Sequence, residues 1–355
     1  MWNVLVTGAT GFIGSALCKQ VAFDNKVVGV YHKKRPVTPA NIVSEQADLT
    51  DVNAVTAICK KYSPDIITHC AGIAHQKIGL VDSATYVRVN SEATENLARA
   101  ASQVNPDVRF IFLSSVSVYG EGRGITSRKG AKAQKRKNYN GIDEDGECKP
   151  SSDYARSKLD AERRLIALAD EGILNDLIIL RLAPVYDREW SFNLNRRVLA
   201  PLNITYIRFG SGLQRMSALA RPNLVDFISF LIENKLATDA HGHMGHRKEK
   251  NTEVDIFNVC DAEAYEFNTL IEVLKNSGIY PNRPVISVPL SAVWFATRMA
   301  GCLLPDKKRW LHSCYDKLAS SLVFDNERML KIGFRPRHSL QTIFDPQITQ
   351  ITQKE

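Results

Sequence analysis

The feature that most constrains this chain is its glycine-rich segment Thr7–Gly14, which has the sequence TGATGFIG. It follows the apolar run Asn3–Val6 and precedes a helical pattern that begins at Ile13, so it joins a predicted strand to a predicted helix. The first glycine permits a tight turn, the second lets the backbone approach a pyrophosphate, and the third allows close packing of helix on strand. These glycines are Gly8, Gly11 and Gly14. Because a helix N-terminus favours anions, the segment predicts a dinucleotide-binding turn.

Apolar runs rich in β-branched residues alternate with helical patterns along the first half of the chain. Strands are predicted at Asn3–Val6, Val27–Tyr31, Ile66–Cys70, Phe110–Ser114 and Leu177–Leu182. Helices are predicted at Ile13–Phe23, Val52–Lys61, Val87–Gln103 and Tyr154–Glu171. This alternation is typical of an α/β fold with a doubly wound parallel sheet, the Rossmann architecture. We expect an NAD(P)-binding domain over residues 1–186 and a smaller, mainly substrate-binding C-terminal domain over residues 187–355, with some segments of the second returning to the first.

The second half of the chain is less regular. We predict helices at Asn223–Lys235 and Phe267–Asn276 and a strand at Asp255–Val259. The stretch Val285–Leu304 is apolar enough to be considered for a membrane, but it contains Arg298, a proline and two serines, which the centre of a membrane helix tolerates poorly. We therefore predict a buried or interface helix there, with a membrane contact as the alternative.

The charge excess belongs to one segment. Lysine and arginine outnumber acidic residues 46 to 38, which gives a formal net charge of +8. Most of this excess lies in a polar insertion, residues 121–142, whose cations are Arg123, Arg128, Lys129, Lys132, Lys135, Arg136 and Lys137. We therefore predict no nucleic-acid partner. A second polar loop, residues 241–251, holds three histidines without the rigid spacing of a ligand set, so no metal site is predicted.

Cysteine usage and the N-terminus predict a cytoplasmic protein. The seven cysteines are scattered and form no CxxC pair, as expected for free thiols in a reducing compartment. The chain passes from Met1 directly into the apolar run Val4–Val6, without the basic region and cleavage site of a signal peptide.

A tyrosine and a lysine form a candidate proton-transfer pair. Tyr154 and Lys158 are four residues apart, which places both side chains on one face of the predicted helix. A phenol with a pKa near 10 is a poor base at neutral pH, but a nearby ammonium stabilises the phenolate and lowers that pKa. We expect Tyr154 to exchange a proton with a hydroxyl or carbonyl group. Taken alone, the YxxxK spacing is also compatible with an ordinary solvated helix face.

The segment Leu113–Gly120, LSSVSVYG, lies at the end of a predicted strand, between the glycine turn and the YxxxK pair. These three motifs, in this order, resemble the extended short-chain dehydrogenase/reductase family, the NAD-dependent epimerases and dehydratases that modify sugar nucleotides. The resemblance implies that Ser115 binds the reacting oxygen, that Tyr154 transfers the proton, and that Lys158 also reaches the cofactor ribose. Ser320–Leu340 is closest to the bacterial subgroup that makes deoxy-sugar nucleotides for polysaccharide.

The resemblance also implies a set of cofactor contacts. Asp48 matches the family aspartate beside the adenine, the turn His69–Gly72 matches the nicotinamide-ribose turn, and Asn90 matches the family asparagine. The predicted cofactor-binding residues are Gly8, Thr10, Gly11, Phe12, Ile13, Gly14, His32, Lys33, Arg35, Asp48, Leu49, Ala71, Gly72, Asn90, Tyr154, Lys158 and Pro184.

The end of the second strand indicates which dinucleotide is preferred. The chain continues with His32, Lys33, Lys34 and Arg35, and the acidic residue that would accept the ribose hydroxyls of NAD is missing. Cationic side chains attract a 2′-phosphate, so we predict NADP(H) in preference to NAD(H). The alternative is that these are ordinary charges on an exposed turn.

The substrate region carries two arginine candidates. Arg181–Tyr186 resembles the family element RPxxVYG, with Asp187 in place of the glycine. Gly210–Asp226 resembles the segment in which an arginine meets the nucleotide diphosphate, which makes Arg215 the candidate and Arg221 the alternative. Either arginine is equally compatible with a plain surface charge. The resemblance implies a nucleotide-sugar substrate and a homodimer.

The type of reaction follows from the residues after Ser115. Family dehydratases place an aspartate and a glutamate there, whereas this chain has Val116 and Ser117, so dehydration is disfavoured. We predict an NADP(H)-dependent oxidoreductase that reduces a nucleotide-linked 4-keto sugar. The alternatives are a nucleotide-sugar 4-epimerase, a steroid-type dehydrogenase of the same superfamily, and a non-catalytic dinucleotide-binding subunit.

Overall fold

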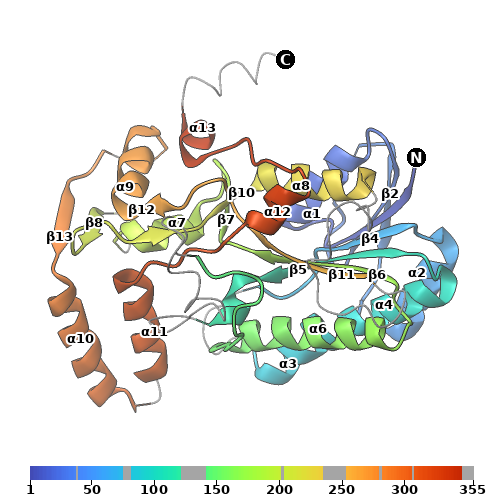
Figure 1. The fold of residues 1–355 in the computed structure, drawn as a ribbon, viewed down its shortest axis with the longest axis horizontal. Coiled ribbons are helices and arrows are strands. Elements are labelled where there is room, and N and C mark those ends of the chain that lie inside the picture. Colours follow the sequence, from blue (N-terminus) through green and yellow to red (C-terminus); the bar gives the residue numbers. More distant parts are fainter. Residues whose placement is uncertain are drawn as a thin grey trace.

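The computed structural model describes residues 1–36, 39–74, 81–120, 141–200, 204–234, 253–279, 282–305 and 308–345 (Figure 1). A seven-stranded parallel sheet lies at its centre, in the order β11-β6-β5-β4-β1-β2-β3. Its strands are β1 (Asn3–Thr7), β2 (Lys26–Tyr31), β3 (Ile42–Gln46), β4 (Ile66–His69), β5 (Arg109–Ser115), β6 (Asp176–Leu182) and β11 (Glu253–Val259). The strand order reverses between β1 and β4, and such a reversal opens a crevice at the carboxyl ends of the strands. The predicted Rossmann fold is confirmed.

Helices cover both faces of this sheet (Figure 1). One face is covered by α1 (Phe12–Val21) and α8 (Arg221–Glu233), and the other by α2 (Val52–Tyr62), α4 (Ala93–Val104) and α6 (Asp153–Asp170). Along β1, Val4 and Val6 belong to the core under α1, whereas Leu5 belongs to the core under α2 and α4. A strand buried on both faces needs apolar residues at every position, which is why the strands appear as continuous apolar runs.

Two elements of the first half differ from the sequence prediction. Strand β3 was not predicted, because it is an edge strand in which only Ile42 is buried. The helix predicted at Val87–Gln103 is divided into α3 (Ser83–Val87), a π-helical segment η1 (Arg88–Glu92) and α4. A π-helical turn shifts the hydrogen-bond register without changing the apolar pattern, and such turns often occur at functional sites.

Smaller elements follow β6 and form a separate layer, on the left of Figure 1. Its short strands are β7 (Val185–Tyr186), β8 (Tyr206–Phe209), β9 (Arg215–Met216), β10 (Leu219–Ala220), β12 (Tyr265–Glu266) and β13 (Val285–Val288). Its helices are α7 (Phe192–Val198), α9 (Phe267–Asn276), α10 (Leu290–Leu303), α11 (Lys308–Ala319) and α13 (Leu340–Phe344). Helix α12 (Glu327–Lys331) returns to the central sheet, where Met329 belongs to the core under α1 and α8. The buried Asp261 carboxylate, directly after β11, connects this layer to α8. It accepts hydrogen bonds from Tyr186 of β7 (2.7 Å), Tyr265 of β12 (2.9 Å) and Asn223 of α8 (2.7 Å).

The segment Val285–Leu304, predicted as one buried or interface helix, is neither a single helix nor buried. The segment begins as strand β13, which pairs with β8, and becomes helix α10 only from Leu290. Within α10 only Gly301 is buried. Of the helices in the described ranges, none is both long enough and apolar enough to cross a membrane.

Several sequence predictions concern residues outside the described ranges. These are the loop at residues 241–251 and residues 121–140 of the basic insertion. None of the seven cysteines, all of which lie in the described ranges, forms a disulfide bond. No cluster of possible metal ligands occurs among the residues that the structure describes.

Candidate active site

The glycine turn has the close packing that the sequence predicts. Gly8 has a φ of 67°, and a Cβ atom there would lie 2.9 Å from the backbone nitrogen of Ala71, in the turn after β4. A Cβ atom at Gly14 would overlap the carbonyl of Gly8, so glycine is required for α1 to pack this closely. Gly11 is the N-cap of α1, whose first turn has no acidic residue. The exposed helix N-terminus therefore fits an anionic pyrophosphate.

A buried histidine connects this turn to the π-helical segment. The His69 ring lies 2.7 Å from Thr7 Oγ1 through Nδ1 and 2.9 Å from Thr94 Oγ1 through Nε2. Thr94 donates its own proton to the carbonyl of Asn90, so it accepts one from His69 Nε2. Burial lowers the pKa of His69 to about 3, so the ring is neutral and Nδ1 accepts from Thr7. Thr7 in turn accepts from the Ala71 N–H, 3.1 Å away. Each group therefore donates to the next, in the order Ala71, Thr7, His69, Thr94 and the Asn90 carbonyl.

Asn90, in the π-helical segment, fixes the turn after β4 against the helix that carries the YxxxK pair. Its side-chain oxygen accepts from the Ile73 N–H at 2.7 Å, and its amide nitrogen donates to the Ile73 carbonyl and to Ser157 Oγ, both at 3.0 Å. A Cβ atom at Gly72 would lie 3.0 Å from Asn90 Oδ1 and 3.5 Å from Lys158 Nζ. The structure thus brings together Gly72, Asn90 and Lys158, which the sequence predicted as cofactor contacts.

Ser115 and Tyr154 are joined by a hydrogen bond between β5 and the first turn of α6. Burial raises the pKa of Tyr154, and the hydrogen bond with Ser115 opposes this shift. Ser115 Oγ also accepts hydrogen bonds from the Ser117 N–H at 3.2 Å and from the Ser117 hydroxyl at 3.0 Å. Because Ser115 Oγ accepts both of these hydrogen bonds, the Ser115 hydroxyl can donate its own proton towards Tyr154.

The Lys158 ammonium faces the turn after β4, 3.5 Å from the position of a Cβ atom at Gly72, where the sequence predicted the cofactor ribose. Lys158 Nζ donates to the Leu113 carbonyl at 2.7 Å and lies 4.7 Å from the centre of the Phe112 ring. Burial lowers the pKa of Lys158 to about 8. The expected lowering of the Tyr154 pKa by this ammonium is therefore not what the structure shows, because burial of the phenol has the larger effect.

The end of β2 is exposed and cationic. His32, Lys33, Lys34 and Arg35 are all exposed, and His32 Nε2 lies 3.6 Å from Asp48 Oδ2. Hydrogen bonds from Thr50, together with the charges of His32 and Arg88, lower the pKa of Asp48. Leu49 packs against the core beside it. The structure thus brings Asp48 to the end of β2, as the adenine-side prediction requires.

Arg221 lies beside the glycine turn. Its guanidinium forms an ion pair with Asp187 at 2.6 Å and lies 4.5 Å from the centre of the Phe12 ring, which also packs on Trp190. Asp187, which replaces the family glycine, closes a tight turn by pairing its backbone with Trp190. The remaining predicted cofactor residues of this region are the exposed Thr10, the half-buried Ile13 and the half-buried Pro184.

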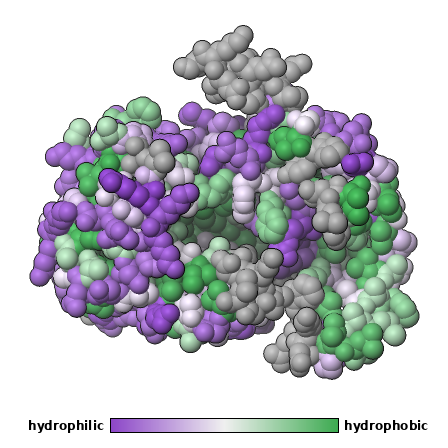
Figure 2. All heavy atoms as spheres, turned by 180° about the vertical axis from the view of Figure 1, so that it is seen from behind, coloured by the Kyte–Doolittle hydropathy of each residue, from purple (hydrophilic) through white to green (hydrophobic). Residues whose placement is uncertain are grey.

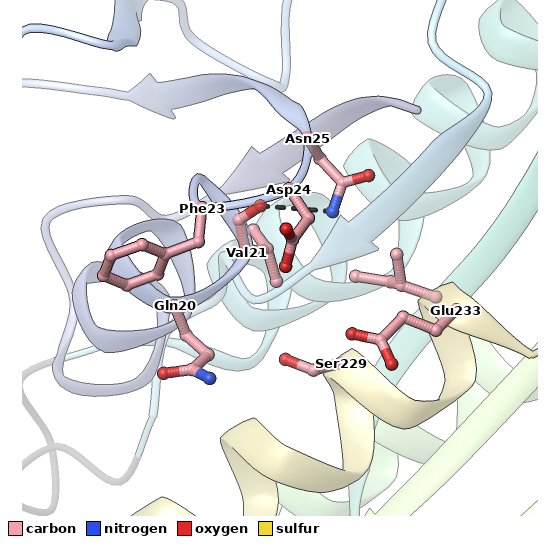
Figure 3. Close-up of a pocket in the computed structure, with 8 residues that line it drawn as sticks. Gln20, Val21, Phe23, Asp24, Asn25, Ser229 and Glu233 are labelled. Carbon is pink, nitrogen blue, oxygen red and sulfur yellow. Dashed lines mark hydrogen bonds between the residues drawn. The ribbon is translucent and has the colours of Figure 1, made fainter. Parts of the chain in front are cut away.

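Arg215 lies in another part of the molecule. It is exposed and lines a cavity of about 560 Å³ together with Tyr265, Arg337 and His338. Neither Ser115, Tyr154 nor Lys158 lines this cavity. A second, smaller cavity of about 240 Å³ lies between the ends of α1 and α8 (Figure 3). It borders Asn25, which precedes β2, and therefore lies at the edge of the sheet opposite the carboxyl ends.

Three features near the site were missed by sequence analysis. His69 lies in a predicted turn, but its two threonine partners are distant in the chain, so no local pattern signals their contact. The sequence showed only that Ser117 is not the acid that a dehydratase needs, and it gave no sign that the Ser117 hydroxyl donates to Ser115. Beneath β5, the buried ion pair of Arg181 and Glu162 (2.7 Å) holds β6 against α6, and Ser114 donates to the same carboxylate.

The fold and these groups define a dinucleotide-binding enzyme of the extended short-chain dehydrogenase type. Residues 4–244 match the model of the NAD dependent epimerase/dehydratase family, and the chain belongs to this family. A UDP-glucose 4-epimerase from Vibrio cholerae is 28% identical over 351 residues, which cover 96% of this chain and 93% of the relative.

Solved structures share the fold over nearly the whole chain. UDP-glucose 4-epimerase from Thermotoga maritima, with UDP-glucose, has a TM-score of 0.68 at 20% identity and covers 99% of both chains. UDP-glucuronic acid 4-epimerase from Bacillus cereus, in complex with NAD, has a TM-score of 0.66 at 20% identity and again covers 99% of both chains.

Proposed function

We propose that this chain is an NADP(H)-dependent oxidoreductase that reduces the 4-keto group of a nucleotide-linked deoxy sugar, a polysaccharide precursor, in the cytoplasm. The observation that carries the choice of a reductase is the exposed cationic end of β2, His32 to Arg35, which suits the 2′-phosphate of a cofactor that is exchanged in each turnover. That none of the seven cysteines forms a disulfide bond supports a reducing compartment.

The site residues divide the chemistry among three side chains. Bound NADPH supplies the hydride for the keto carbon. Ser115 Oγ holds the keto oxygen and Tyr154 donates a proton to it, which gives the alcohol and leaves a phenolate. The Lys158 ammonium, one turn further along α6, stabilises that phenolate. Neither Val116 nor Ser117 supplies the acid that elimination of water needs.

The pyrophosphate of the cofactor is assigned to the N-terminus of α1, and the diphosphate of the substrate to Arg215. Arg221 is the alternative for the substrate, but its ion pair with Asp187 and its stacking on Phe12 place it on the cofactor side. Arg215 is exposed and lines the cavity of about 560 Å³, which Ser115, Tyr154 and Lys158 do not line.

A nucleotide-sugar 4-epimerase is the second candidate. It is favoured by the relative from Vibrio cholerae, a UDP-glucose 4-epimerase that aligns with 96% of this chain. The same three side chains serve an epimerase, in which the hydride is removed from and returned to C4 within one turnover. A non-catalytic subunit would need neither the hydrogen-bonded Ser115 and Tyr154 nor Lys158, and a steroid-type dehydrogenase would need no diphosphate-binding arginine.

The test is to incubate the protein with NADPH and a panel of UDP-, GDP- and dTDP-linked 4-keto sugars and to follow the absorbance of the reduced nicotinamide. We expect stoichiometric oxidation of NADPH with at least one substrate and none with the Tyr154→Phe variant. If UDP-hexoses are instead interconverted at C4 without net change in the nicotinamide, the protein is an epimerase and the reductase proposal is wrong.

A further inference from the structure

Helices α10 and α11 form a hairpin that projects from the C-terminal layer, at the lower left of Figure 1. The two helices approach closely at Gly301, where a Cβ atom would lie 3.3 Å from Lys308 Cγ. The side of α10 that faces α11 holds its less exposed residues. The rest of α10 is exposed, so this helix buries little of its apolar surface within the chain.

The exposed side of α10 is apolar and aromatic. Trp294 is 47% exposed, Phe295 62%, Met299 50% and Leu303 78%. Phe295, Met299 and Leu303 are spaced at four-residue intervals and form one stripe along the helix, which Trp294 borders. Apolar side chains gather at the lower right of Figure 2, where α10 lies when the molecule is seen from behind. Soluble monomers rarely expose such a contiguous patch unless it binds something.

The charge of the hairpin indicates what covers this patch. From Arg283 to Ala319 the sequence has six lysine and arginine residues against two aspartates, and Leu290–Leu303 has no acidic residue. The Arg298 guanidinium lies 5.3 Å from the centre of the Trp294 ring, so a cation and an aromatic ring occupy the same edge of the apolar face. Lys308 is exposed where the two helices meet. Exposed aromatics bordered by cations are typical of helices that lie in the interface of an anionic bilayer.

We propose that α10 is a docking helix by which this protein binds reversibly to an anionic phospholipid surface. The 14 residues of α10 extend about 21 Å, too short to span a bilayer whose hydrocarbon core is about 30 Å thick. The helix therefore lies in the interface plane, with Trp294 and Phe295 among the acyl chains and Arg298 and Lys308 at the phosphates. A second copy of the chain is a poorer occupant, because two-fold pairing through α10 would bring the same cations of both copies together. The proposal does not depend on which reaction the active site performs.

The test is flotation of the full chain with vesicles of phosphatidylcholine alone or mixed with phosphatidylglycerol. We expect binding to the mixed vesicles that is at least about tenfold tighter than to the neutral ones and that weakens as salt is added. The double variant Trp294→Gln/Phe295→Gln should lose at least about tenfold in vesicle affinity, because it removes the apolar anchor. Its matched control is Phe23→Gln, since Phe23 is 82% exposed at the end of α1, outside the hairpin (Figure 3).

A second pair of variants tests the cations. Arg298→Gln/Lys308→Gln should reduce binding to the mixed vesicles and flatten its salt dependence, whereas Lys19→Gln/Lys26→Gln, which changes two exposed lysines of the first domain, should change neither. Circular dichroism and cofactor affinity, which should equal those of the unmodified protein, confirm that each variant is folded. The proposal is overturned if the unmodified protein does not float with anionic vesicles, or if the aromatic variant floats as well as its control. It is also overturned if light scattering shows a dimer that only the aromatic variant loses, since a second copy then covers the patch.

Discussion

Replacing His69 with glutamine tests whether the buried hydrogen-bond chain between the glycine turn and the π-helical segment has the direction that the structure indicates. Thr7 donates to His69 Nδ1, so loss of this acceptor leaves a buried hydroxyl proton without a partner unless the glutamine oxygen replaces it. An unsatisfied buried donor costs about 1–3 kcal/mol. We therefore expect His69→Gln to lower the free energy of unfolding by about that amount above neutral pH.

The pH dependence is the sharper test. The pKa of His69 is lowered from 6.5 to about 3 by burial, so below pH 6.5 the unfolded chain binds a proton that the folded protein refuses. Stability from this group is therefore complete above pH 6.5 and is lost as the pH falls towards 3. One pH unit below 6.5 the loss is about 1.4 kcal/mol. The glutamine variant has no such titration. The difference in free energy of unfolding between the two proteins should therefore be smaller by this amount one pH unit below 6.5 than above neutral pH.

The assay is urea unfolding of both proteins at a series of pH values from neutral to mildly acidic. Glu144 complicates either curve alone, because burial raises its pKa to about 7 and gives its contribution the opposite sign. That contribution is common to both proteins and cancels in their difference. If the difference in free energy of unfolding is the same at neutral pH and one unit below the ordinary histidine pKa, then the neutral, buried ring inferred here is wrong.

Four further changes test the remaining assignments. Tyr154→Phe should reduce turnover by about 100-fold or more with cofactor binding nearly unchanged, because only the proton-transferring oxygen is removed; near-normal turnover would contradict its role. Neutral residues at positions 33–35 should erode a preference for NADPH over NADH by about tenfold or more, as measured by dissociation constants, and equal constants in the unmodified protein would refute the charge argument. Ser117→Ala should lower kcat several-fold with KM little changed, and Ser117→Thr should restore it, because the hydroxyl orients Ser115. Glu144→Gln should gain stability relative to the unmodified protein as the pH rises from 4.5 to about 7, by about 1.4 kcal/mol per pH unit at most and no further above 7, because the folded variant no longer buries an ionisable carboxyl; identical pH profiles would exclude this.

Local sequence patterns were sufficient for the parts of the fold in which the pattern and the environment agree. The strands of the sheet interior were predicted because both of their faces are buried and every residue is apolar, as in Val4–Val6. Strand β3 has one buried residue, Ile42, followed by the exposed Val43 and three polar residues, so it lacks this signal. The hydrophobicity of α10 was equally visible, but hydrophobicity alone does not show whether another element covers it. The structure shows that α11 covers only one side.

Contacts between distant residues account for what sequence analysis missed at the site. Thr7 and His69 are 62 residues apart and meet because β1 and β4 are neighbours at the point where the strand order reverses. Packing of η1 against α6 brings Asn90 to Ser157, 67 residues further along, and so connects the turn after β4 to the helix of Tyr154. Positions of this kind are set by sheet topology rather than by any motif.

The position of the Lys158 ammonium is a feature that residue spacing alone does not predict. The YxxxK spacing places Tyr154 and Lys158 on one face of α6, and the structure has both side chains there. Spacing does not determine where a flexible four-carbon side chain ends, and Lys158 Nζ is held by the Leu113 carbonyl on β5. Burial of both groups then opposes ionisation of each, since it raises the pKa of Tyr154 and lowers that of Lys158 to about 8. The proton transfer that we propose for Tyr154 therefore takes place where burial disfavours the charged form of both the phenol and the amine.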